Sequence, residues 1–169
     1  MRQAHIIIMG VSGAGKSTIA AALATQLGYP FLEGDQYHSP ENIAKMASGK
    51  PLENSDRKLW IAALCEAANA QFSESQQPCI ISCSALNTQV RAWIETGLDV
   101  PCRYVYLDGP YALIAARLSR REDHFFDASL LRSQFDALDI PDQALRVGID
   151  RSQAEIVEDI IRALNKERE

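Results

Sequence analysis

Residues 5–17 read HIIIMGVSGAGKS, and this stretch decides the fold. An apolar run is followed by a segment that satisfies GxxxxGK[ST] at every specified position. In that pattern the glycines let backbone N–H groups turn towards phosphate oxygens, and the next helix points its positive end at the same anion. Lys16 is expected to reach the β- and γ-phosphates of a nucleotide, and Ser17 to coordinate Mg²⁺. The predicted phosphate-binding residues are Gly10, Val11, Ser12, Gly13, Ala14, Gly15, Lys16 and Ser17.

Short apolar runs alternate with amphipathic segments of helical length along the rest of the chain. The runs, which we interpret as buried strands, cover residues 5–9, 30–33, 78–83, 102–107 and 146–149. The helical segments cover residues 16–27, 40–47, 55–73, 88–96, 111–119, 130–138 and 153–166, and Ser152 is placed to cap the last one. This alternation predicts an α/β fold in which helices cover both faces of a parallel sheet. Ligands of such sheets bind at the carboxyl ends of the strands.

Length and charge narrow the classes of function. The 169 residues correspond to one domain, and the formal net charge is -5 without a long Lys/Arg run, which disfavours nucleic acid as a partner. The first ten residues contain only four consecutive apolar residues, too few for a signal-peptide core or a membrane span, so a cytoplasmic location is expected. The four cysteines form no CxxC pair and are expected to be reduced and structural.

A phosphate-binding loop alone does not separate kinases from GTPases or motors. An NKxD-type guanine motif is absent, because Asn165-Lys166 is followed by Glu-Arg. A larger ATPase core needs more chain than this protein has. These observations favour a small-molecule kinase that uses ATP.

Two acids follow the second apolar run, at Glu33 and Asp35. A strand period of two would put both side chains on one side, facing the phosphate-binding loop. We assign Asp35 to the acceptor hydroxyl, as the group that orients it and takes its proton, and Glu33 to the water shell of Mg²⁺. Asp108, which ends the run YVYLD, is a competing metal site.

Several longer stretches resemble the gluconokinases, a family within the shikimate-kinase-like group of P-loop kinases. The most specific is FLEGDQYHSPENIAKMASGKPLENSDRKLW, at residues 31–60. The others are GVSGAGKS at 10–17, CSAL at 83–86, RLSRREDHFF at 117–126 and QFDAL at 134–138. Together these stretches span most of the chain.

The resemblance implies one domain over residues 1–169 with a three-layer P-loop kinase fold, a five-stranded parallel sheet and a mobile lid at roughly residues 118–130. It also implies Mg²⁺ as cofactor, transfer of phosphate from ATP to D-gluconate to give 6-phospho-D-gluconate, and often a homodimer. Nucleic acids and membranes are not expected as partners.

The resemblance also assigns residues. Asp35, His38 and Arg57 would lie at the sugar-acid site, where Arg57 can bind a carboxylate through a bidentate fork. Arg117 would bind ATP, and Arg121 would contact the transferring phosphoryl group. His124 would lie in the lid region and contact the substrate. Three other interpretations stay open: an ion pair of Arg57 with Asp56 or Glu53, a structural role for His38, and a solvated helix end for the arginines.

The chain departs from the family after CSAL. Gluconokinases usually continue with two lysines, an aromatic residue and an arginine, whereas this chain has Asn87-Thr88-Gln89-Val90-Arg91. Arg91 is retained and is predicted to bind the substrate, while Asn87 or Thr88 is expected to cap a helix. The altered segment leaves open another sugar acid, shikimate or a nucleotide as substrate. The alternative outside the enzymes is a nucleotide-binding regulatory module.

Overall fold

The computed structural model describes residues 3–121 and 128–166. Five strands form one parallel sheet in the order β2-β3-β1-β4-β5. The strands are β1 (His5–Met9), β2 (Phe31–Glu33), β3 (Ile80–Ser82), β4 (Cys102–Asp108) and β5 (Leu145–Gly148). The predicted five-stranded parallel sheet is therefore confirmed.

The helices flank the sheet and extend beyond one end of it. They are α1 (Lys16–Leu27), α2 (Pro40–Ala47), α3 (Asn54–Ser75), α4 (Thr88–Gly97), α5 (Tyr111–Ser119), α6 (Ala128–Ala137) and α7 (Gln153–Lys166). A short 3-10 helix, η1 (Gly34–Tyr37), follows β2 directly and was not predicted.

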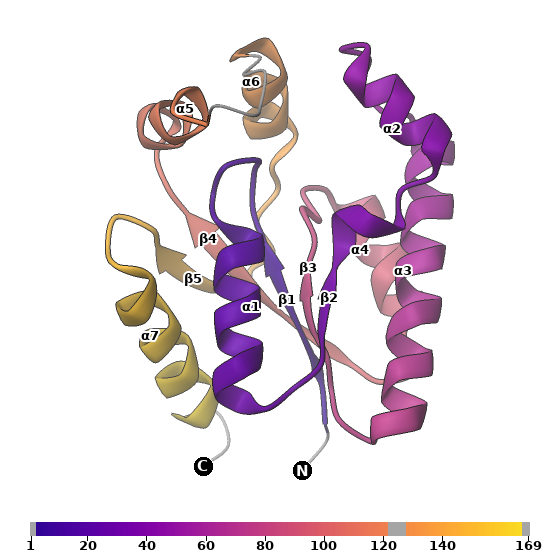
Figure 1. Cartoon of the computed structure of the whole chain (residues 1–169), viewed down its shortest axis with the longest axis vertical. Coiled ribbons are helices and arrows are strands. Elements are labelled where there is room, and N and C mark those ends of the chain that lie inside the picture. Colours follow the sequence, from indigo (N-terminus) through magenta and orange to yellow (C-terminus); the bar gives the residue numbers. More distant parts are fainter. Residues whose placement is uncertain (1–2, 122–127, 167–169) are drawn as a thin grey trace.

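Strand β1 lies at the centre of both halves of the core. Ile6 and Ile8 point to one face, where they belong to the apolar cluster that includes α1 and α7. Ile7 and Met9 point to the other face and pack with α3 and α4. Figure 1 shows the resulting three layers, with α1 and α7 on one side of the sheet and α3 and α4 on the other.

The predicted elements agree with the structure to within three residues at each end. The capping role of Ser152 is confirmed, because its hydroxyl accepts a hydrogen bond from the backbone N–H of Glu155 at 3.3 Å. The prediction that every strand is buried is wrong for β2, all of whose residues are half-buried, and for β5, in which only Val147 is buried. The reason is that these two strands lie at the edges of the sheet, where one side has no neighbouring strand.

All the strands end on the same side of the molecule, and Figure 1 shows α2, α5 and α6 beyond that end. The predicted lid begins in the last turn of α5 and reaches into α6, but residues 122–127, and with them His124, lie outside the described residues. The mobility of the lid stays a prediction. No helix within the described ranges has the length and apolar composition needed to cross a membrane.

Burial of His5 predicts a pH-dependent stability. The His5 side chain is fully buried, and its Nδ1 accepts a hydrogen bond from the backbone N–H of Cys79 at 2.9 Å. Burial lowers the pKa of His5 below its ordinary value of 6.5, and Asp99 opposes this shift. At acidic pH, His5 therefore binds a proton more readily in the unfolded chain than in the folded chain. The free energy of unfolding should fall as the pH drops below about 6.5.

Urea unfolding of wild type and His5→Asn at about pH 7.5 and about pH 5.5 measures this effect, since Asn keeps an acceptor for the Cys79 N–H but does not titrate. We expect the variant to lose less stability on acidification than wild type. His38→Asn measures the separate contribution of His38, whose pKa burial also lowers. Equal losses in wild type and His5→Asn would contradict the prediction.

Candidate active site

The loop between β1 and α1 has the backbone geometry of a phosphate cradle. Gly13 and Gly15 adopt left-handed conformations, with φ of 81° and 96°, which residues with a Cβ rarely adopt. A Cβ on Gly13 would lie 2.6 Å from the side chain of Leu118 in α5. The loop is thus held closely beneath α5, with its N–H groups at the start of α1.

Lys16 is the charged centre of this loop. Its Nζ donates a hydrogen bond to the Val11 carbonyl at 3.0 Å. Burial lowers the pKa of Lys16. The carboxylates of Asp35 and Glu33 raise this pKa, whereas the Arg121 guanidinium lowers it further. All three predicted charged groups therefore act on the same ammonium, although their roles in catalysis stay predictions.

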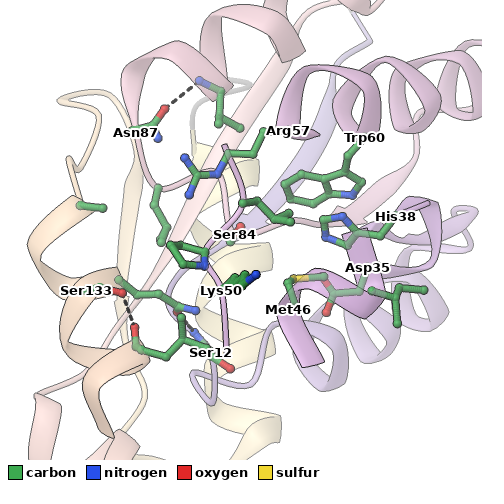
Figure 2. A pocket seen from close by; sticks show the side chains of 18 of the residues that line it. Ser12, Asp35, His38, Met46, Lys50, Arg57, Trp60, Ser84, Asn87 and Ser133 are labelled. Carbon is green, nitrogen blue, oxygen red and sulfur yellow. Dashed lines mark hydrogen bonds between the residues drawn. The ribbon is translucent and has the colours of Figure 1, made fainter. Parts of the chain in front are cut away.

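A cavity of about 450 Å³ opens beside Lys16 at the carboxyl ends of the strands. Three of the predicted substrate residues line it, namely Asp35, His38 and Arg57. Ser12 of the phosphate-binding loop lines it as well. Figure 2 shows Asp35 and His38 on one side of this cavity and Ser12 at its base. The structure therefore brings a phosphate cradle, a carboxylate and a guanidinium into one space.

Asp35 reaches the cavity through the turn that follows β2. Strand β2 ends at Glu33, and Gly34 starts η1 in a position where a Cβ would lie 2.2 Å from the Ser82 carbonyl oxygen. The prediction that Glu33 and Asp35 share one side of a strand is wrong, because Asp35 lies in a 3-10 helix. Glu33 instead accepts a hydrogen bond from the Ser82 hydroxyl at 2.6 Å, while Asp35 lines the cavity.

His38 forms part of the cavity wall by stacking on an indole. Its ring lies 4.1 Å from that of Trp60 between centroids, at an interplanar angle of 20°. The Trp60 Nε1 donates to the Gly34 carbonyl at 2.8 Å, which fixes the indole. Burial lowers the pKa of His38, and the Asp35 carboxylate raises it. The stacked ring thus has a structural role, and it also lines the cavity where a hydroxyl could bind.

The ion pairs considered for Arg57 do not form. Asp56 binds Lys45 at 2.7 Å, and together with Glu53 it makes the capping box of α3. The Arg57 guanidinium makes no hydrogen bond or ion pair with any residue in the described ranges. Because it lines the cavity, its donors are available to a ligand.

Arg91 occupies a different place from the one predicted. Its buried guanidinium donates to the Ala85 carbonyl at 3.0 Å, to the Asp139 carbonyl at 2.7 Å and to the Asp139 carboxylate at 3.0 Å. Ala85 has a left-handed backbone, with φ of 45°. Arg91 does not line the cavity, and both its Nη1 and its Nη2 are bonded within the protein, so its geometry fits a structural role and not the predicted contact with substrate.

The remaining basic residues lie near the end of α5. Arg117 donates to the Ile149 carbonyl at 2.6 Å, beside the turn after β5, so this donor is already used within the protein. Arg121 is exposed just after α5. Asp108, the competing metal site, is paired with Arg146 at 3.0 Å. That pairing weakens the case for Asp108 as a metal ligand.

Sequence reasoning missed several polar residues of the cavity, among them Lys50 and Gln134. Lys50 lies in the connection between α2 and α3, and Gln134 lies in α6. Both fall in stretches that carried the family resemblance, but no motif for phosphate or carboxylate chemistry marks either one. Only the folded chain brings these residues to Lys16.

Comparisons with known proteins indicate which family the chain resembles. A family model described as an AAA domain matches residues 6–139. The gluconokinase of Gluconobacter oxydans (strain 621H) is 38% identical over 170 residues, covering 99% of this chain and 94% of the relative. The thermoresistant gluconokinase of Escherichia coli (strain K12) is 40% identical over 167 residues, covering 96% and 94%.

Solved structures show the same relationship. The crystal structure of a gluconokinase from Sinorhizobium meliloti 1021 has a TM-score of 0.85 and 37% identity, over 96% of this chain and 92% of that one. The parallel sheet, the phosphate-binding loop and the adjoining cavity define an ATP-dependent P-loop kinase. With relatives this similar over nearly its whole length, the chain belongs to the gluconokinase family.

Proposed function

We propose that this enzyme transfers the γ-phosphoryl group of ATP to D-gluconate and forms 6-phospho-D-gluconate. The observation that carries the proposal is the Arg57 guanidinium, which lines the same cavity as Lys16 and Asp35 and has no bonding partner among the described residues. A guanidinium binds a carboxylate through two parallel hydrogen bonds, and Asp35 suits a hydroxyl. Gluconate carries a carboxylate at one end and a primary hydroxyl at the other. The names of the relatives support the same substrate.

The residues divide the work of an in-line transfer. Asp35 orients the terminal hydroxyl of the substrate and accepts its proton as the new oxygen–phosphorus bond forms and the bond to ADP breaks. Lys16 holds the β- and γ-phosphates, and Arg121 balances the charge of the phosphoryl group in transit. Because the transferring group is held and not chemically activated, positioning supplies most of the rate.

The donor set fits Mg²⁺ held jointly by protein and nucleotide. Ser17 is exposed in the first turn of α1, where a hydroxyl can coordinate the ion, and Glu33 is close enough to Lys16 to affect its pKa. Within the described residues, no three His, Cys, Asp or Glu side chains gather to hold a metal by themselves. Mg²⁺ typically takes one or two protein ligands plus phosphate oxygens and water, and when bound it would neutralise phosphate charge.

The altered segment after CSAL contributes a cap and not a charge. The Asn87 side chain accepts a hydrogen bond from the Val90 N–H at 2.9 Å, as predicted for a cap, and Asn87 also lines the cavity. Lys50 lines the same cavity and adds a cation to it. We infer that Lys50 compensates for lysines that gluconokinases usually carry after CSAL, so that a sugar acid is still preferred.

A coupled ADP-release assay tests the substrate, with D-gluconate, L-idonate, shikimate, glucose and AMP as acceptors. We expect D-gluconate to be preferred, because glucose lacks the anion and AMP presents a phosphate where a hydroxyl is needed. Arg57→Ala should cost about 1.5 to 3 kcal/mol in kcat/KM for gluconate, the scale of a hydrogen bond to a charged group. Lys58→Ala, on the exposed neighbour of Arg57, is the matched control.

Three results would overturn this proposal. A preference for AMP or shikimate would make the enzyme a different kinase. Unchanged gluconate kinetics in Arg57→Ala would mean that another residue binds the carboxylate of the substrate. ATP binding without ADP release in the presence of any of these acceptors would favour the regulatory module. A homodimer, a cytoplasmic location and contacts of His124 with the lid and substrate stay predictions for the same protein.

A further inference from the structure

The stretch QFDAL at residues 134–138 has no role in the mechanism above. In the structure it spans the end of α6 and the residue after it. The Phe135 ring meets Tyr111 of α5 edge to face, with 5.6 Å between centroids. Leu138 packs against the apolar cluster under α3 and α4. Two apolar residues of the stretch therefore hold α6 in place, and the role of Gln134, at the start of QFDAL, has still to be explained.

Gln134 is bonded to the phosphate-binding loop across 122 positions of sequence. Its Oε1 accepts a hydrogen bond from the backbone N–H of Ser12 at 2.7 Å. The assignment of oxygen to this position is chemically required, because an amide NH₂ cannot accept a hydrogen bond from an N–H. Backbone N–H groups of this loop type surround the phosphates of a nucleotide. Gln134 is therefore fixed at the loop that holds the reacting phosphates.

A primary amide has two donors besides its acceptor. The Nε2 of Gln134 makes no hydrogen bond with the residues that the structure describes. Gln134 lines the same cavity as Lys16 and Asp35, between which the phosphoryl group must pass. With Oε1 committed to Ser12, the two N–H donors are left for an acceptor in that cavity.

The position of α6 is set independently of any ligand. The chain just after the helix is held by Arg91, which binds the Asp139 carbonyl at 2.7 Å and its carboxylate at 3.0 Å. The Asp139 N–H in turn donates to the Leu86 carbonyl at 2.8 Å. These bonds fix the chain five residues after Gln134. The amide is thus preorganised, which is the condition under which a donor stabilises developing charge well.

We propose that Gln134 is a further catalytic residue, which donates a hydrogen bond from Nε2 to an oxygen of the transferring phosphoryl group while its Oε1 stays on the Ser12 N–H. The proposal rests on the kinase function proposed above. It assigns to α6 a direct contact with the reacting group, besides the charges of Lys16 and Arg121.

Two substitutions separate this role from a structural one. Gln134→Ala removes both the acceptor and the donors, whereas Gln134→Glu keeps an acceptor for the Ser12 N–H but replaces the donors with a negative charge. If Nε2 contacts the phosphoryl group, kcat with D-gluconate should fall roughly tenfold to a hundredfold in the alanine variant. It should fall at least about tenfold more in the glutamate variant, because like charges repel. Gln89→Ala and Gln89→Glu, on the exposed face of α4, are the matched controls.

Turnover in Gln134→Glu equal to or above that of Gln134→Ala would overturn the proposal, since the acceptor for Ser12 would then be all that matters. Thermal melting without ligand checks that each variant folds. A kcat profile against pH gives a second readout, because protonation of the new carboxyl restores a donor and should partly recover kcat of the glutamate variant at low pH. A merely structural role would show no such recovery.

Nucleotide binding tests Gln134 without any sugar acid. The rise in melting temperature with MgATP should shrink in Gln134→Glu by more than the rise with MgADP, because only ATP carries the γ-phosphate. Equal losses for both nucleotides would overturn the contact. If the wild type binds ATP but does not phosphorylate D-gluconate, the proposed substrate is wrong. The comparison of ATP with ADP would still test whether Gln134 contacts the γ-phosphate.

Discussion

Replacing Lys16 with alanine should remove at least about 3 kcal/mol of transition-state stabilisation, a loss of kcat/KM on the order of 10² or more. The reason is the position of its ammonium within the phosphate cradle, where Nζ now donates to the Val11 carbonyl. In a partly buried site a charge is screened less than in water, so its removal is costly. Steady-state kinetics in the ADP-release assay measure the loss.

The same substitution should have little effect on folding. Burial lowers the pKa of Lys16, which means that the protein environment disfavours its charged form, so alanine relieves a cost as it loses a hydrogen bond. Urea unfolding should give a free energy close to that of wild type. Lys166→Ala, at the exposed end of α7, is the control for loss of one positive charge. Turnover close to normal in Lys16→Ala would contradict the assignment of the nucleotide site.

Asp35→Asn should lower turnover by a factor on the order of 10² to 10⁴, while the affinity for ATP changes little. Asn keeps the size and an acceptor oxygen of Asp35 but cannot take the proton of the substrate hydroxyl. Asp35 is exposed to the cavity at the start of η1, so the substitution should leave the fold intact. Single-turnover kinetics with D-gluconate and a separate titration of ATP binding measure the two effects.

Glu33→Gln is the matched comparison, because Glu33 acts on the same lysine but is bound to Ser82 and does not line the cavity. We expect it to shift the Mg²⁺ concentration required for half-maximal rate and to lower turnover less than Asp35→Asn. If Asp35→Asn instead shifts the Mg²⁺ dependence and preserves turnover, the roles of the two acids are reversed.

Local patterns allowed much of this protein to be predicted. The glycines and the Lys-Ser pair at residues 10–17 form a phosphate-binding motif, which lies between a strand and a helix in P-loop proteins. The motif therefore predicted both the strand before it and the helix after it. The helices were located because amphipathic periodicity and caps such as Ser152 and Asn87 are properties of neighbouring residues. The acid at position 35 was chosen for its chemistry and the guanidinium at 57 through the family resemblance, and both line the cavity.

Other features depend on residues that only the folded chain brings together. The order β2-β3-β1-β4-β5 places β2 at an edge of the sheet. The strand was expected to continue to Asp35, but it ends at Glu33 and η1 begins at Gly34. Arg91 was predicted to bind the substrate but lies against Asp139, 48 residues away, and Gln134 reaches Ser12 across 122. The sequence by itself determined the loop, the elements and the candidate chemistry, because periodicity and motif are local. Tertiary structure alone decided which polar groups bind one another and which are left for a ligand, because a hydrogen bond depends on distances between residues remote in sequence.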